Sequence, residues 1–174
     1  MPLVVHRWLK ITLLNLFIVA AIGVVLRYKI AYSLPFIDQK HLLHGHSHFA
    51  FAGWISQAIM VLLVAYLAKE KEASVFKKYN WLLYANLVTA YCMLIAFPIE
   101  GYGLYSIIFS TASIIVSYAF AIIYWKDLNQ LKNKSISHKW FKAAVFFNAF
   151  SSLGAFALAI MMVSKIIHQN WYLA

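Results

Sequence analysis

Five long apolar stretches constrain this chain more than any other feature. They cover roughly residues 11–27, 42–67, 79–98, 102–125 and 140–164, with short loops between them. A helix needs about 20 predominantly apolar residues, within a range of about 17–25, to cross the hydrocarbon core of a bilayer. Lipid offers no partners to backbone N–H and C=O groups, so such segments must be helical. The sequence therefore predicts an all-α, polytopic membrane protein with five transmembrane helices in a single domain over residues 1–174.

Composition supports this class. Of the 174 residues, 64% are hydrophobic and 11% are charged, which is too apolar for a water-soluble globule of this size. Arg7 and Lys10 before the first stretch are also typical of a secretory signal. A small-residue cleavage site does not follow, and Arg27 and Lys29 end the stretch as flanking charges do. We therefore interpret it as an uncleaved first helix.

The Lys and Arg residues alternate between the two sides of the predicted bundle. One side carries eleven: Arg7, Lys10, Lys69, Lys71, Lys77, Lys78, Lys126, Lys132, Lys134, Lys139 and Lys142. The other side carries four: Arg27, Lys29, Lys40 and Lys165. Cytoplasmic loops are enriched in these residues, so the amino terminus is expected in the cytoplasm, with a bacterial inner membrane as the expected location. Anionic lipid at the inner surface accounts for the net charge of +10, and a nucleic-acid partner is not expected.

Four of the seven histidines, His41, His44, His46 and His48, open the second apolar stretch. Ionisable side chains inside a membrane are costly and usually face a bundle interior, a cavity or a bound cofactor. With a helical rise of 1.5 Å per residue, His44 to His48 lie roughly 4–11 Å below the outer edge of the predicted helix. The cluster is therefore the candidate functional site, on the side away from the cytoplasm.

Helical spacing sorts these histidines into faces. His41, His44 and His48 form one stripe, and His44 and His48, four residues apart, are spaced to bind one metal ion. His46 is rotated from its neighbours by about 200° and points the other way. An alternative for His41, and for His44, is an interfacial position at the mouth of the helix, as Tyr and Trp often adopt.

Other residues near the cluster are candidates for supporting roles. Gly45 and Gly53 leave room for a flat macrocycle or for a second backbone. Glu100 lies in a predicted tight turn over 98–103 on the same side. With His41 it is a candidate for proton transfer or polar support, although a solvated turn carboxylate is the alternative.

Polar side chains within the predicted spans include Asn15, Gln57 and Asn86, which we expect to form interhelical hydrogen bonds. Cys92 is the only cysteine, which excludes a disulfide framework, a thiolate zinc site and a Cys-x-x-Cys-His attachment site for covalent haem. No catalytic residue is assigned.

The segment from His44 to Trp54, His-Gly-His-Ser-His-Phe-Ala-Phe-Ala-Gly-Trp, resembles the histidine-bearing segment of the haem-copper oxidase subunit I superfamily, especially its cbb3-type and nitric-oxide-reductase-like branches. The resemblance implies a non-covalent, low-spin haem bound by an axial histidine near the outer end of the second helix. His44, His46 and His48 all remain candidates for that ligand.

The resemblance is limited to this segment. The family's later histidines have no counterpart, since His138 and His168 flank the fifth predicted helix. The expectation is therefore an oxidoreductase-like electron-transfer component that does not reduce oxygen by itself. Its expected partners are another oxidase-like subunit or a missing carboxy-terminal half.

A second hypothesis assigns the same cluster to a metal ion. In it, His44 and His48 bind Zn or Cu near the outer mouth of a membrane metal-binding or transport protein. A purely structural role in assembly is the third alternative.

Overall fold

The computed structural model of the protein describes residues 3–72, 74–131 and 135–163. Every element in this part of the chain is a helix: α1 (Leu3–Ala31), α2 (Gln39–His48), η1 (Phe49–Ser56), α3 (Gln57–Glu70), α4 (Val75–Glu100), α5 (Leu104–Asn129) and α6 (Ile136–Val163). The prediction of an all-α protein is confirmed. The segments α2, η1 and α3 follow one another without a gap and form one long helix, whose middle part, η1, has π-helical bonding.

Four helices of the described chain are long and apolar enough to cross a membrane. They are Leu3–Ala31, Gln39–Glu70, Val75–Glu100 and Leu104–Asn129, which contain the first four predicted apolar stretches almost completely. Each extends past its apolar stretch at one or both ends, because the polar flanks also adopt helical conformation. The fifth predicted span, 140–164, lies within α6 except for its last residue, which lies outside the described residues. Lys165 and His168 also lie outside them. That span stays a prediction, as does the orientation of the chain.

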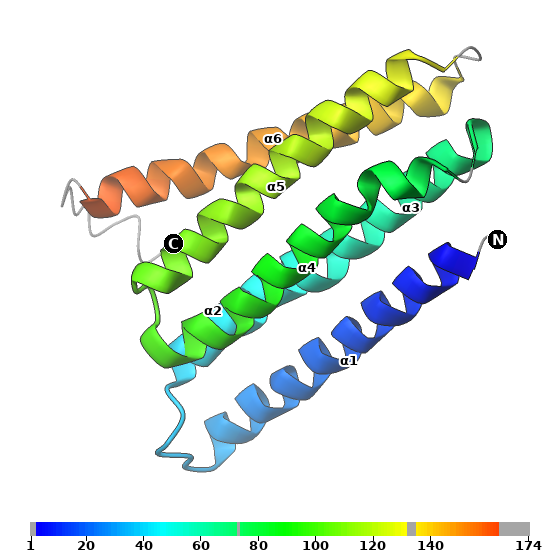
Figure 1. Cartoon of the computed structure of the whole chain (residues 1–174). Helices are drawn as coiled ribbons and strands as arrows, with labels where there is room; N and C mark the ends of the chain where they lie inside the picture. The colour runs from blue at the N-terminus through cyan, green and yellow to red at the C-terminus, as the bar shows by residue number, and fades with distance from the viewer. Residues whose placement is uncertain (1–2, 73, 132–134, 164–174) are drawn as a thin grey trace. The chain divides into compact units, whose positions relative to one another are not determined.

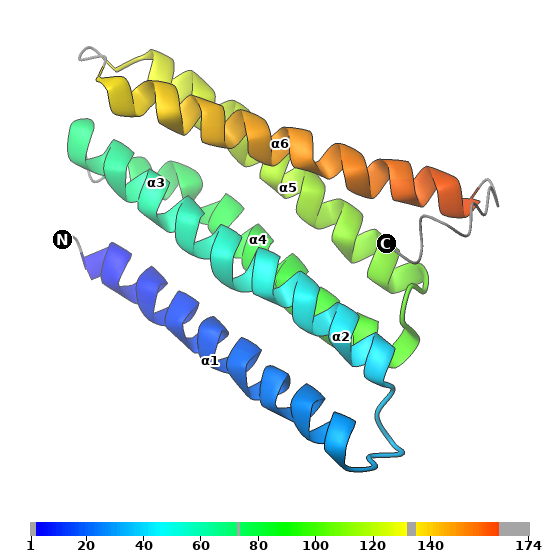
Figure 2. The ribbon, with the colours of Figure 1, turned by 180° about the vertical axis from the view of Figure 1, so that it is seen from behind.

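The chain divides into two compact units, residues 1–132 and 133–174. The single transmembrane domain over 1–174 stays a prediction. Within the first unit, α4 packs against α5 and against α2, η1 and α3, and α1 also packs along α2, η1 and α3. Figures 1 and 2 show the long helix behind α4 in one view and in front of it in the other. The helices run alternately up and down, so the beginning of α2 and the end of α4 share one end of this unit.

Unit 133–174 contains α6. At its start, the Ser135 N–H donates a hydrogen bond to His138 Nδ1 at 3.2 Å, and the His138 N–H donates to the Ser135 carbonyl at 3.1 Å. These two bonds satisfy backbone groups that a helix beginning leaves open. His138 thus takes part in closing the first turn of α6.

An ionic cluster joins the helices at the opposite end of the first unit from the histidines. Asp127 of α5 is only 3% exposed, and its carboxylate accepts from Lys78 Nζ at 2.7 Å and from the Tyr79 hydroxyl at 2.7 Å. Lys71, just after α3, lies 3.3 Å from the same carboxylate. The cluster therefore attaches the connection between α3 and α4 to the end of α5. We refer to these four residues as the Asp127 cluster.

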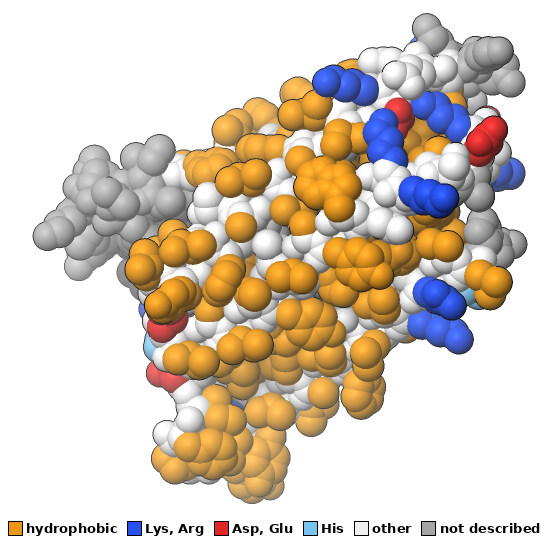
Figure 3. Space-filling view, viewed as in Figure 1, with side chains coloured by type: hydrophobic (Ala, Val, Ile, Leu, Met, Phe, Trp, Pro, Cys, Tyr) orange, Lys and Arg blue, Asp and Glu red, His pale blue; other side chains and the backbone are white. Residues whose placement is uncertain are grey.

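The turn predicted over 98–103 is shorter than expected. Helix α4 continues to Glu100 with Pro98 inside its last turn, and the chain reverses at Gly101. Gly101 has φ +62°, and its N–H donates to the Phe97 carbonyl at 2.9 Å. A positive φ is readily adopted only by glycine, so the turn is placed by Gly101 and not by the proline. Figure 3 shows that hydrophobic side chains dominate the visible face of the molecule, as expected for helices surrounded by lipid.

Candidate functional site

The helix that carries the histidines starts with a side-chain cap. Asp38 accepts a hydrogen bond from the His41 N–H at 2.8 Å, as an N-cap residue does. This hydrogen bond lowers the pKa of the Asp38 carboxyl from its usual value. Because the helix begins at Gln39, His41 lies within its first turn and the other three histidines within the next two.

Two of the histidines face α4. The His48 ring stacks on Phe97 with centroids 4.3 Å apart and planes 8° from parallel. The His44 ring meets Tyr102 edge-on at 4.7 Å, and Phe97 and Tyr102 meet at 5.3 Å. We call these four residues the aromatic cluster. Burial raises the pKa of the Tyr102 hydroxyl, as expected for a phenol partly removed from water.

His46 faces the opposite side, towards α1. A Cβ placed on Gly23 would lie 3.5 Å from His46 Cε1, so the ring lies against the backbone of α1 at that glycine. The opposed faces of His46 and the His44–His48 pair, predicted from helical spacing, are confirmed. A single ion between α2 and α4 would therefore not reach His46.

Two imidazole nitrogens in this region are buried and have no hydrogen-bond partner within the described part of the chain. They are His44 Nε2 and His46 Nδ1. An unpartnered polar atom in a buried position costs about 1–3 kcal/mol, so proteins rarely retain one without a reason. Within the described residues, these two nitrogens are thus the polar atoms of the histidine cluster that are buried without a partner.

His41 and the two bracketing glycines are placed by close contacts. Gly45 lies against Pro98 of α4, where a Cβ would approach Pro98 Cδ to 3.0 Å, so this glycine admits another helix. Gly53 is covered by the ring of Phe49 in its own helix. The His41 ring lies over Gly101 in the turn after α4.

We expect Gly101→Ala to destabilise the protein by about 1–3 kcal/mol, because alanine is strained at a positive φ. A Cβ at this position would also lie 2.5 Å from His41 Nε2. The measurement is unfolding of the purified protein in detergent. The double variant His41→Ala/Gly101→Ala separates the two causes, since it removes the clash and leaves the backbone strain. Equal stability of Gly101→Ala and the unmodified protein would contradict the expectation.

Glu100 serves the start of α5. Its Oε1 accepts from the Ser106 N–H at 2.6 Å and from the Ser106 hydroxyl at 3.0 Å, and so satisfies a backbone donor in the first turn of that helix. The hydrogen bonds described for this carboxylate go to Ser106 rather than to a histidine. Its proposed role in proton transfer therefore stays a prediction.

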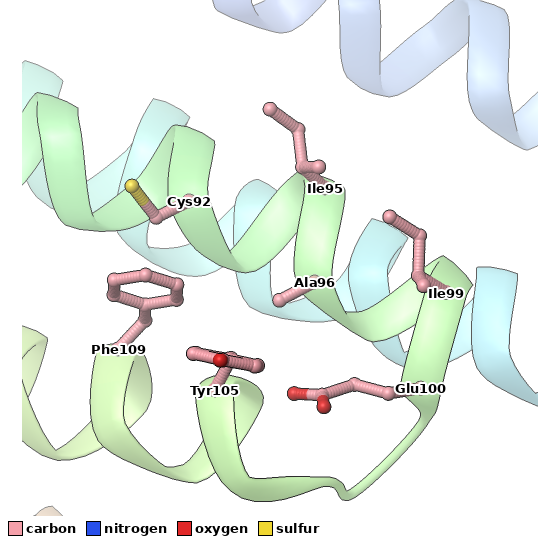
Figure 4. A pocket seen from close by; sticks show the side chains of 7 residues that line it. All are labelled: Cys92, Ile95, Ala96, Ile99, Glu100, Tyr105 and Phe109. Carbon is pink, nitrogen blue, oxygen red and sulfur yellow. The ribbon is translucent and has the colours of Figure 1, made fainter.

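A groove between α4 and α5 lies beside Glu100 (Figure 4). Its volume is about 440 Å³, and it is lined by Cys92, Ile95, Ala96, Ile99, Glu100, Tyr105 and Phe109. Seven residues line it, and the four histidines are not among them. The groove is therefore separate from the histidine cluster.

The described residues supply only part of the ligand set of a metal ion. Within the described residues, no group of three or more His, Cys, Asp or Glu side chains is close enough together to hold a metal ion. His44 and His48 form a pair on one face of the helix. The two acidic residues at this end, Asp38 and Glu100, accept hydrogen bonds from backbone N–H groups in the first turns of α2 and α5.

Sequence reasoning missed the π segment that follows the histidines. The predicted interhelical hydrogen bonds of Asn15, Gln57 and Asn86 are confirmed, since Asn86 Nδ2 donates to Gln57 Oε1 at 2.8 Å and Asn15 donates to the Gly53 carbonyl. The apolar run over 49–56 carries no signal that separates π from α bonding.

Comparison of the chain with protein-family models, with curated proteins and with solved structures finds no match.

Proposed function

We propose that this chain is a haem-binding membrane protein that takes part in electron transfer, with an imidazole of the His44–His48 segment as axial ligand. In this proposal the amino terminus is cytoplasmic and the haem lies near the opposite surface. The membrane assignment rests on four helices that are long and apolar enough to span. The haem assignment is supported by the resemblance of His44–Trp54 and by the chemistry of the imidazoles.

The observation that carries the proposal is the pair of unpartnered nitrogens, His44 Nε2 and His46 Nδ1. Neutral imidazole is a common axial ligand of haem iron, and iron binding would satisfy a nitrogen that is otherwise buried without a partner. These two histidines come first among the candidates. His48 comes third, because neither of its nitrogens is among the buried polar atoms without a partner in the described residues.

Ligand number favours haem over a bare metal ion. The porphyrin supplies four ligands to iron, so the protein needs to add only one or two. A structural zinc site needs four protein ligands and a catalytic one needs three, whereas His44 and His48 supply two. When bound, haem would supply reversible one-electron chemistry, and the chain would orient the ring and exclude water from it.

The spectrum of the purified protein tests this proposal. We expect a Soret band in protein expressed with haem available, and its loss in the triple variant His44→Ala/His46→Ala/His48→Ala. Single variants identify the ligand, with the largest loss at His44 or His46. The control is His6→Ala, which removes an exposed histidine from α1 and should leave the band unchanged.

A second candidate function is supported by the His44–His48 pair. Copper or zinc bound at one equivalent, without a haem spectrum, and lost in His44→Ala, would replace the haem proposal with the metal one. A protein that contains neither haem nor metal would contradict both.

A further inference from the structure

The π segment η1 begins directly after the histidines, and two of its carbonyls, those of Ala52 and Gly53, accept hydrogen bonds from other helices. In π bonding an N–H reaches the carbonyl five residues back instead of four, and such segments often occur at functional sites. At the end of η1, the Gln57 N–H donates to the Trp54 carbonyl, three residues back. That donor is thus directed away from Ala52 and Gly53, which lie five and four residues back.

Both carbonyls accept hydrogen bonds from asparagines of neighbouring helices. Asn86 Nδ2 of α4 donates to the Ala52 carbonyl at 2.9 Å, and Asn15 Nδ2 of α1 donates to the Gly53 carbonyl. The Tyr91 hydroxyl donates to Asn15 Oδ1 at 2.7 Å and orients that amide. Asn15 is fully buried and Asn86 is 1% exposed. In surroundings without water, such side-chain donors stabilise carbonyls of a segment whose backbone bonding departs from the regular α pattern.

The register of η1 decides where the histidines point. Each residue of an α-helix adds about 100° of rotation. A π segment that accommodates one extra residue therefore rotates the helix before it, relative to the helix after it, by about 100° compared with continuous α bonding. With the π register, His46 lies against Gly23 of α1, and His48 stacks on Phe97 of α4. A change to continuous α bonding over 49–56 would rotate each imidazole away from its present neighbour.

We propose that Asn15 and Asn86 are positioning residues of the histidine site. Their hydrogen bonds keep η1 in its π register, and that register directs the imidazoles of α2 to α1 and α4. Only the haem readout described below rests on the proposed function. The orientation of α2 is measured without haem.

The first experiment measures this orientation in bilayers. Single nitroxide labels are placed along 40–48 and 59–67 in a Cys92→Ser background, and the accessibility of each to oxygen gives the phase of each helix face. In Asn15→Leu/Asn86→Leu we expect the pattern over 40–48 to shift by about one residue, or about 100°, relative to 59–67. An unchanged phase in this variant overturns the proposal.

Thr89→Val is the matched control. The Thr89 hydroxyl donates only within α4, to the Ala85 and Asn86 carbonyls at 3.0 Å each, so its loss removes a polar group beside Asn86 without touching η1. We expect the unmodified phase in this variant. A shift of the same size as in the asparagine variant would assign the effect to α4 packing and overturn the proposal.

If the double variant does not fold, a deletion tests the premise of the proposal, which is that the π register of η1 sets the direction of the histidines. Removing Ala50 takes out the residue that η1 accommodates, so the segment is expected to adopt α bonding with the histidines still on their faces. Removing Ala65 from α3 shortens a regular α-helix and is expected to rotate one part of the helix against the other by about 100°. A rotated 40–48 pattern in the Ala50 deletion overturns the proposal.

The haem readout separates the two proposals. In a protein that binds haem, Asn15→Leu/Asn86→Leu is expected to lower haem affinity by about 10–100-fold, as the loss of groups that orient a ligand does. An accompanying change in the axial-ligand signature of the EPR spectrum is expected, which a general loss of stability would not produce. If the unmodified protein shows no Soret band, the proposed function fails, while the nitroxide pattern still decides the role of the asparagines.

Discussion

Replacement of Asp127 by alanine is expected to destabilise the first unit by about 3 kcal/mol, at the lower end of the range for breaking a buried charge pair. The carboxylate is 3% exposed and binds Lys71, Lys78 and Tyr79. Its loss leaves the fully buried Tyr79 hydroxyl without this acceptor. The two ammonium groups can regain water, because the lysine side chains are 27% and 52% exposed, which keeps the effect at the lower end.

Unfolding of the detergent-solubilised protein measures this effect, and two variants interpret it. Asp127→Asn keeps an acceptor for Tyr79 but removes the charge, so we expect a smaller loss of about 1 kcal/mol, in the range of one hydrogen bond. Glu70→Ala removes an exposed carboxylate from the last turn of α3 and should change stability by less than about 0.5 kcal/mol. If Asp127→Ala were no worse than Glu70→Ala, the Asp127 cluster would not contribute to stability.

Replacement of Phe97 by alanine is expected to cost about 3 kcal/mol, again at the lower end of the range for a buried phenylalanine. Phe97 is fully buried and contacts His44, His48 and Tyr102 of the aromatic cluster. In a membrane the unfolded helices remain in an apolar environment, so the loss comes mainly from packing around the cavity. The stacking surface of His48 also disappears, so we expect the axial-ligand spectrum to broaden if haem is bound.

Two substitutions calibrate the effect of Phe97. Phe51→Ala removes a ring of the same size that is 67% exposed on η1, and it should change stability by less than about 0.5 kcal/mol. Phe97→Leu fills much of the cavity and should lie between the two, although it lacks the flat face on which His48 stacks. A Phe97→Ala variant as stable as Phe51→Ala would contradict the packing described here.

The histidine site shows how far sequence patterns reach. The faces of His46 and of the His44–His48 pair could be predicted, because three- and four-residue spacing places side chains on one side of a helix regardless of its neighbours. The partners of these rings could not be predicted. Phe97 and Tyr102 are far from His48 in sequence, and only the packing of α4 on α2 brings them together. The predicted topology places Glu100 on the same side of the membrane as the histidines, but it does not identify its partner: the hydrogen bonds described for its carboxylate go to Ser106.

Apolar length and helical periodicity are local properties, and they were sufficient to predict an all-helical protein with membrane-spanning segments and an imidazole stripe at the start of the second. The π register of η1 depends on contacts between helices. In the proposal made above it is held by amides 34 and 38 residues away, Asn86 and Asn15, which donate to the Ala52 and Gly53 carbonyls. No local pattern encodes the arrival of those donors, so the helix that each histidine meets is decided by the packing, while their relative faces follow from helical spacing.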